Sequence, residues 1–156
     1  MGETKVTAVP RTQEIIITRD FDAGRDLVFK LYTDPDLMPQ WLGPRRLTMK
    51  IEKMEVRPGG AWRYIHSEAD GTEYGFRGVY HDVATPERIV GTFEFEGMPG
   101  HVSLDTSMFD DRGGKTRLTI KSVFQSVEDR DGMLESGMEG GLSEAFDRLD
   151  ELLSKV

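Results

Sequence analysis

The feature that most constrains this chain is a run of six alternating segments within residues 47–124, separated by turn signals. Apolar side chains recur at every second position, as in residues 47–51, which is typical of strands with one covered face. Turn sequences such as residues 69–72 join neighbouring segments. The alternation changes parity near Lys53, which predicts a β-bulge there. Six consecutive turn-linked strands predict one antiparallel sheet.

Ahead of these strands, the sequence predicts a further strand and two short helices. Residues 15–18 are all β-branched, as in a strand, and the apolar positions in residues 27–32 are spaced as on one helix face. A second short helix is expected to begin at Pro35, because proline is favoured at the first helical position. Residues 1–12 have no usable period and are expected to form a loose tail. Residues 13–156 are therefore predicted to form a single domain.

The C-terminal segment has the spacing of a long helix. Apolar residues recur at threes and fours from Leu134 to Val156. Ser126 is the expected N-cap, with Asp129 three residues later. Glycines within residues 137–141 each cost about 1 kcal/mol relative to alanine inside a helix, so a kink or two consecutive helices is the alternative. Because only this segment is long enough to cover the sheet, we expect a curved sheet around a helix, with a cavity between them.

Composition excludes several classes of protein. The chain has 156 residues and no cysteine, which excludes a disulfide framework, a thiolate metal site and a cysteine nucleophile. Its net charge of −8 is a poor match for nucleic acid or for an anionic membrane surface. No apolar run approaches the roughly 18 residues of a spanning helix, and the N-terminus lacks a signal-peptide core. A cytoplasmic protein is therefore expected, without partners among nucleic acids or membranes.

Short motifs in a fixed order also carry a resemblance across residues 13–154. They are Asp34-Pro35 with Gln40-Trp41-Leu42-Gly43-Pro44, Arg57-Pro58-Gly59-Gly60-Ala61-Trp62, Asp70-Gly71-Thr72-Glu73-Tyr74, Gly78-Val79-Tyr80, Pro86-Glu87-Arg88-Ile89, Gly114-Lys115-Thr116-Arg117-Leu118-Thr119 and Gly137-Met138-Glu139-Gly140-Gly141-Leu142 with Leu149 and Leu152. Together they resemble the START-like, helix-grip superfamily often labelled SRPBCC. Within it, the chain is similar to the C-terminal domain of the activator of the 90-kDa heat-shock protein's ATPase.

The resemblance implies an α+β helix-grip fold. This fold is a curved antiparallel sheet of about seven strands around a long C-terminal helix, with two short helices after the first strand. It also implies binding or transport of a small apolar molecule, and a link to the stress response. Leu42 and Leu142 stand where relatives often carry aromatic residues, and both are expected to reshape the cavity rather than the fold.

The covered face of the sheet holds the candidate ligand-binding residues. Aromatic side chains with polar tips suit an apolar pocket that orients its ligand, and a packed aromatic core is the alternative reading. Trp41 is expected either at the cavity mouth or as an anchor for the short helices. The full candidate set is Trp41, Trp62, Tyr64, His66, Tyr74, Phe76, Tyr80 and Phe93, with Met108, Met138, Leu142 and Phe146 opposite.

Charged and polar candidates are fewer. His66 and Glu68 share a face and could form an acid–base pair, or simply a strand-end pair in solvent. The histidines lie on three different predicted strands, so we expect no metal site, and no cofactor is indicated. Arg45 or Arg46 could meet an acidic group of a ligand. The acidic face of the last helix is either solvated or a docking surface for a basic partner.

Three functions remain open from the sequence. The first is a binding domain for a small hydrophobic ligand, acting as a monomer or homodimer. The second is a chaperone-associated interaction protein. The third is a cavity enzyme of the cyclase or dehydratase type that uses His66 with Glu68 or a tyrosine. The residues favour a protein that is not an enzyme.

Overall fold

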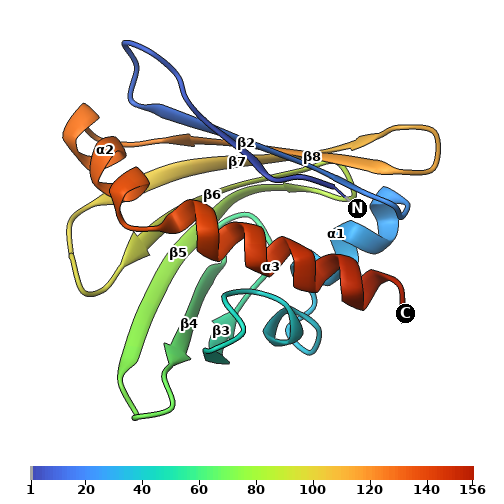
Figure 1. The fold of residues 1–156 in the computed structure, drawn as a ribbon, viewed down its shortest axis with the longest axis horizontal. Coiled ribbons are helices and arrows are strands. Elements are labelled where there is room, and N and C mark those ends of the chain that lie inside the picture. Colours follow the sequence, from blue (N-terminus) through green and yellow to red (C-terminus); the bar gives the residue numbers. More distant parts are fainter. Residues whose placement is uncertain (1) are drawn as a thin grey trace.

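Eight strands form one antiparallel sheet in the computed structural model, which describes residues 2–156. The strands are β1 (Lys5–Ala8), β2 (Glu14–Phe21), β3 (Thr48–Met54), β4 (Ala61–Ser67), β5 (Glu73–Ala84), β6 (Arg88–Phe95), β7 (Val102–Asp111) and β8 (Thr116–Val123). Their spatial order is β1-β2-β8-β7-β6-β5-β4-β3. The sheet is curved and does not close, because β1 and β3 remain its two edges (Figure 1).

Within residues 2–156, four helical segments accompany the sheet. They are α1 (Arg25–Thr33), the 3-10 turn η1 (Met38–Gln40), α2 (Val127–Glu135) and α3 (Met138–Leu153). Helix α3 runs across the sheet, with α1 and η1 beside its C-terminal half (Figure 1). This arrangement confirms the predicted α+β helix-grip fold. No helix within residues 2–156 has the length and apolar character needed to cross a membrane.

The C-terminal segment forms two consecutive helices, α2 and α3, which meet at one of its glycines. Gly137 separates α2 from α3 and has a φ of +85°, a conformation that glycine adopts without the strain of a side chain. Ser126 is the N-cap of α2, and its hydroxyl accepts a hydrogen bond from the Asp129 amide at 3.0 Å. The expected cap and the alternative of two consecutive helices are both confirmed.

One predicted N-terminal detail is wrong, and a second is confirmed only in part. Residues 5–8 are not loose, because they pair with β2, with Lys5 opposite Thr18. Four residues are too few to show a period, so this eighth strand was not predicted. The second short helix is present, but it is the 3-10 helix Met38–Gln40 and does not begin at Pro35. Pro39 lacks the amide hydrogen that a helix begun at Pro35 would need at that position.

The bulge predicted in the first sheet segment is confirmed. The pairing of β3 with β4 shifts register between Ile51 and Lys53. The shift keeps Ile51 and Met54 on the same face of the sheet as Tyr64 and Trp62, which lie opposite them. Both aliphatic side chains therefore face the candidate site.

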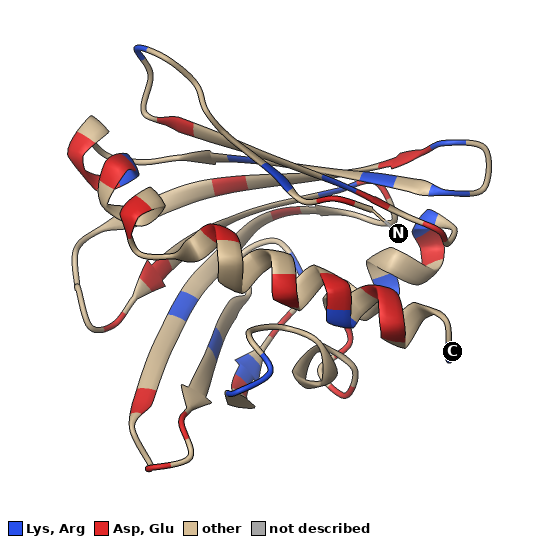
Figure 2. Cartoon of the chain, in the orientation of Figure 1, with Lys and Arg blue, Asp and Glu red and all other residues tan. Residues whose placement is uncertain are grey.

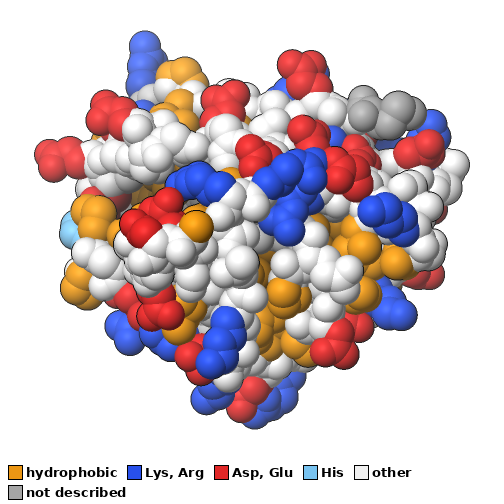
Figure 3. Space-filling view, turned by 60° about the horizontal axis from the view of Figure 1, so that its bottom comes forward, with side chains coloured by type: hydrophobic (Ala, Val, Ile, Leu, Met, Phe, Trp, Pro, Cys, Tyr) orange, Lys and Arg blue, Asp and Glu red, His pale blue; other side chains and the backbone are white. Residues whose placement is uncertain are grey.

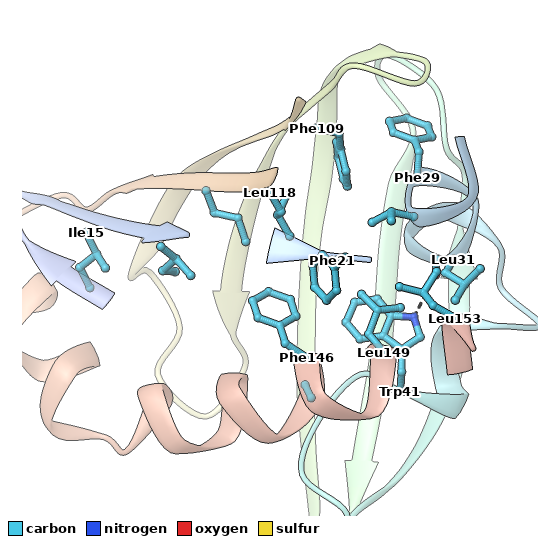
Figure 4. Packing of buried hydrophobic residues seen from close by; sticks show 14 of the residues in the cluster. Ile15, Phe21, Phe29, Leu31, Trp41, Phe109, Leu118, Phe146, Leu149 and Leu153 are labelled. Atoms are coloured by element: carbon cyan, nitrogen blue, oxygen red, sulfur yellow. Dashed lines mark hydrogen bonds between the residues drawn. The ribbon is translucent and has the colours of Figure 1, made fainter. Parts of the chain in front are cut away.

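The hydrophobic core fills one end of the concave face, between α1, α3 and the strands β2 and β8 (Figure 4). Phe21 and Phe146 meet edge to face there, with ring centres 5.6 Å apart. Trp41 is fully buried, and its indole nitrogen donates a hydrogen bond to the Leu31 carbonyl at 3.0 Å. Trp41 therefore anchors η1 to the core, and the other end of the concave face is left less densely covered.

Acidic residues are spread along α3 (Figure 2). Some of them have partners within the protein. Arg19 of β2 is 2% exposed, and its guanidinium contacts Asp147 at 3.0 Å and Asp150 at 2.6 Å. A buried arginine requires such carboxylates, because an unpaired charge away from water is costly. Part of the acidic face therefore holds α3 on the sheet.

Candidate functional site

A pocket of about 270 Å³ lies at the less densely covered end of the concave face. Its wall is formed by strands β3 to β8, and α1, η1 and α3 close the other side. Most of the lining is apolar. The lining residues are Tyr32, Met38, Trp41, Leu42, Ile51, Lys53, Met54, Trp62, Tyr64, Tyr80, Ile89, Gly91, Thr92, Phe93, Asp105, Ser107, Ile120 and Leu142.

The sheet register explains the aromatic wall. Residues directly opposite in an antiparallel pair share a face, and Trp62 lies opposite Gly78 on β5. A Cβ atom on Gly78 would come within 2.6 Å of the Trp62 indole nitrogen, so glycine makes room for the large ring. Trp62 then stacks on Tyr64 at 5.1 Å with an interplanar angle of 18°, and lies 6.1 Å from Phe93.

The structure places eleven of the twelve candidate residues in three groups. Those that line the pocket are Trp41, Trp62, Tyr64, Tyr80, Phe93 and Leu142. His66, Tyr74 and Phe76 share the same face further along the sheet, with Phe76 5.5 Å from Phe93. Phe146 and Met138 belong to the hydrophobic core or pack against it.

Met108 is on the wrong side of the sheet for a pocket residue. On β7 the side chains of Ser103, Asp105 and Ser107 lie opposite the inward-facing residues of β6, so Met108 points to the outer face. The apolar residues of β7 up to Met108 suggested the opposite orientation. They misled because the inward face of this strand is polar where it borders the pocket.

His66 is a buried histidine without the expected acidic partner. The side chain is 5% exposed, and its Nδ1 atom has no hydrogen-bond partner within residues 2–156. Its ring lies edge-on to Tyr64. Burial, assisted by the charge of Arg148, lowers the pKa of His66 to about 4. Glu68 instead accepts a hydrogen bond from the Tyr74 hydroxyl. His66 and Glu68 therefore form neither an acid–base pair nor a strand-end pair in solvent.

Asp105 is the acidic residue among the described lining residues of the pocket, and the sequence did not reveal it. Its carboxylate accepts a hydrogen bond from the Ser103 hydroxyl at 3.1 Å. Burial raises the pKa of Asp105 to about 6, although hydrogen bonds from Ser122 and Ser103 lower it. Burial, together with the Asp105 charge, also raises the pKa of Tyr64, so the phenol stays neutral. The available signal was an acidic residue in mid-strand between two serines at alternate positions.

Comparison with known proteins decides the family. Residues 22–154 match the family described as "Activator of Hsp90 ATPase homolog 1-like protein". The chain belongs to this family. The resemblance stated from the motifs is thereby confirmed, and no curated protein matches the chain.

Solved structures share the fold of this family member. A protein from Rhodobacter sphaeroides is 25% identical, with a TM-score of 0.92 and 99% of each chain covered. A protein from Arthrobacter aurescens is 28% identical, with a TM-score of 0.88, covering 97% of this chain and 92% of its own. CalU16 from Micromonospora echinospora is 21% identical, with a TM-score of 0.64, covering 99% of this chain and 85% of its own. This last likeness concerns the fold alone.

In this member of the activator homologue family, α3 holds the loop that follows η1. Arg148 donates hydrogen bonds to the carbonyls of Gly43 at 2.8 Å and Gln40 at 3.0 Å. Arg45 forms an ion pair with Glu151. Because Trp41 and Leu42 line the pocket, these contacts fix one side of it.

The arginines considered as ligand contacts have partners within the chain. Arg45 is bound to α3, and the Arg46 guanidinium lies 3.6 Å from Glu68. In the part of the chain that the structure describes, no three His, Cys, Asp or Glu side chains are grouped to hold a metal ion.

Hydrophobic side chains reach the surface between charged ones on the face shown in Figure 3.

Proposed function

We propose that this chain binds a small apolar molecule in the pocket beside α3. The observation that carries the proposal is an apolar space of about 270 Å³ with an aromatic wall. An apolar protein cavity of about 150 Å³ accommodates benzene. Ligand pockets for larger molecules begin near 300 Å³. The space therefore suits a molecule of one or two rings, or a ring with a short chain.

The exposure of the wall supports ligand binding over simple core packing. Trp62, Tyr64 and Phe93 point to the concave face, yet each stays partly exposed, whereas core residues such as Phe146 are fully buried. Covering apolar surface contributes about 25 cal/mol for each Å² removed from water. A ligand that stacks on these rings would gain that stabilisation without displacing the core.

The proposal is tested by ligand-induced stabilisation. A molecule that binds only the folded state raises its melting temperature, so small aromatic compounds should stabilise the wild-type protein. Phe93→Ala should reduce this shift, and native mass spectrometry should detect the complex. Leu104→Ala is the matched control, because Leu104 is 46% exposed on the outer face of β7. Stabilisation that is equal in both variants, or absent from the wild type, would contradict the proposal.

A further inference from the structure

We infer that the ligand of this pocket presents a hydrogen-bond donor, either a hydroxyl or a protonated amine, to the carboxylate of Asp105. The inference rests on the proposed function and adds the chemistry of the ligand's polar group. Asp105 is the one acidic residue among the lining residues within the described chain. A ligand that met only the aromatic wall would leave this carboxylate facing an apolar molecule.

Neighbouring residues leave the carboxylate open toward the pocket. Asp105 lies opposite Gly91 on β6 and opposite Ser122 on β8. Gly91 has no side chain to cover Asp105 from the β6 side, and Gly91 itself lines the pocket. Ser103 and Ser122 donate to the carboxylate from the sheet. Because an ionised carboxylate has about four acceptor sites, two serine hydroxyls do not satisfy it.

The lining supplies no cation for Asp105. Lys53 is the basic residue among the described lining residues, but its side chain is 54% exposed and its Nζ atom lies 3.7 Å from Glu55. On α3, Arg148 is engaged with the carbonyls of the loop after η1. A carboxylate without a buried cation is costly to keep away from water. Burial accordingly raises the pKa of Asp105.

These contacts select among ligand chemistries. A hydroxyl or ammonium group would donate a hydrogen bond to the carboxylate. Hydrogen bonds to a charged group are stronger than those between two neutral groups. An ammonium group would also be favoured near the faces of Trp62 and Tyr64. An acidic ligand would meet repulsion from Asp105, and a pure hydrocarbon would leave the carboxylate unsatisfied.

The test compares four probes with one aromatic body: 2-phenylethanol, 2-phenylethylamine, ethylbenzene and phenylacetate. At pH 7.5, we expect the alcohol or the amine to bind the wild-type protein at least about tenfold more tightly than the other two. Asp105→Asn should reduce amine binding about tenfold and leave ethylbenzene binding nearly unchanged. Asp110→Asn is the matched control, because Asp110 lies on the same strand but on the outer face, opposite Arg117.

Each outcome has a defined meaning. Tighter binding of the amine than of the alcohol assigns a cationic ligand, and the reverse assigns a neutral hydroxyl compound. Equal affinities for all four probes, or an unchanged preference in Asp105→Asn, overturn the inference while ligand binding itself stands. Absence of binding by every probe to folded wild-type protein overturns the proposed function as well. Circular dichroism checks the fold, and Asp105→Ser serves if Asp105→Asn does not fold.

Discussion

Gly43 lies directly against the imidazole of His66. A Cβ atom at position 43 would come 2.9 Å from Nδ1 of His66 and nearer still to Cε1. Gly43 also has a φ of +97°, which side chains disfavour. The loop after η1 therefore sits on the end of β4 only because residue 43 lacks a side chain, and this contact closes His66 off from solvent.

Replacing Gly43 by alanine tests this contact. Gly71 is the matched control, because it has a φ of +93° and no atom within 4 Å of an added Cβ. Gly71→Ala should lower the free energy of unfolding by about 1 kcal/mol through backbone strain alone. Gly43→Ala adds the clash with His66 and should lower it by about 2 to 4 kcal/mol. Urea unfolding measures both, and equal losses would show that the ring moves aside freely.

His66 should make the protein sensitive to acid. Its pKa in the folded state is lowered to about 4 by burial and by Arg148, whereas an unfolded histidine titrates near 6.5. As the pH falls from about 6.5 to 4, the unfolded chain takes up a proton that the folded chain does not. The free energy of unfolding should then decrease by up to about 3 kcal/mol.

The variant His66→Gln removes this source of acid sensitivity. Its stability relative to wild type should rise as the pH is lowered from 7 to 4.5, as measured by urea unfolding. His81→Gln, at an exposed position of β5, should show no comparable trend. A constant difference between His66→Gln and wild type across this range would contradict the lowered pKa.

The sequence predicted most of the fold because its signals are local. Alternation and turns define six of the strands, and the bulge near Lys53 appears as a change of parity. The strand at residues 5–8 was missed, since its stability comes from pairing with β2 rather than from its own pattern. Its four residues carry no such signal.

The candidate site was only partly accessible from sequence. The aromatic residues of β4 could be placed on one face because period-two alternation fixes the face. On β7 the same logic selected Met108, because the pocket-facing residues there are Ser103 and Asp105. Alternation assigns the apolar residues of a strand to the inner face. On β7 the inner face is polar beside the pocket, so this rule places Asp105 on the wrong face. The burial of His66 by Gly43 depends on a loop whose path the sequence does not specify.

Asp105 should show the opposite pH dependence to His66. Burial raises its folded-state pKa to about 6, from the 3.8 of a freely exposed aspartate. Below about pH 4 both states are protonated, and above about pH 6 the folded state carries a carboxylate that it disfavours. The groups around it, namely Tyr32, Tyr64, Ser103 and Ser122, supply no positive charge. Ionisation therefore destabilises the folded state by up to about 3 kcal/mol at neutral pH.

Asp105→Asn should accordingly be more stable than wild type above pH 7. This advantage should shrink as the pH falls toward 4, because wild-type Asp105 then becomes neutral as well. Urea unfolding at pH 4.5 and 7.5 measures the change, with Asp110→Asn on the outer face as control. If the difference from wild type were the same at both pH values, the raised pKa would be wrong.

Arg148 should control how tightly the loop after η1 stays closed. Its guanidinium donates to the carbonyls of Gln40 and Gly43, and Arg148→Ala leaves both without this partner. Loss of two charge-assisted hydrogen bonds at a partly exposed site should lower stability by about 1 to 2 kcal/mol. Opening of this loop should become more frequent, since local opening requires less free energy.

Amide hydrogen exchange followed by mass spectrometry measures that opening directly. In Arg148→Ala, residues 38–43 should exchange faster, while the central strands β7 and β8 keep their protection. Arg45→Ala is the matched control: its ion pair with Glu151 is about half exposed on both sides, and exposed pairs contribute about 0 to 1 kcal/mol. Equal exchange in the two variants would mean that packing of Trp41, rather than Arg148, closes the loop. If ligands enter past this loop, Arg148→Ala should also release a bound aromatic probe faster without changing the residues that contact it.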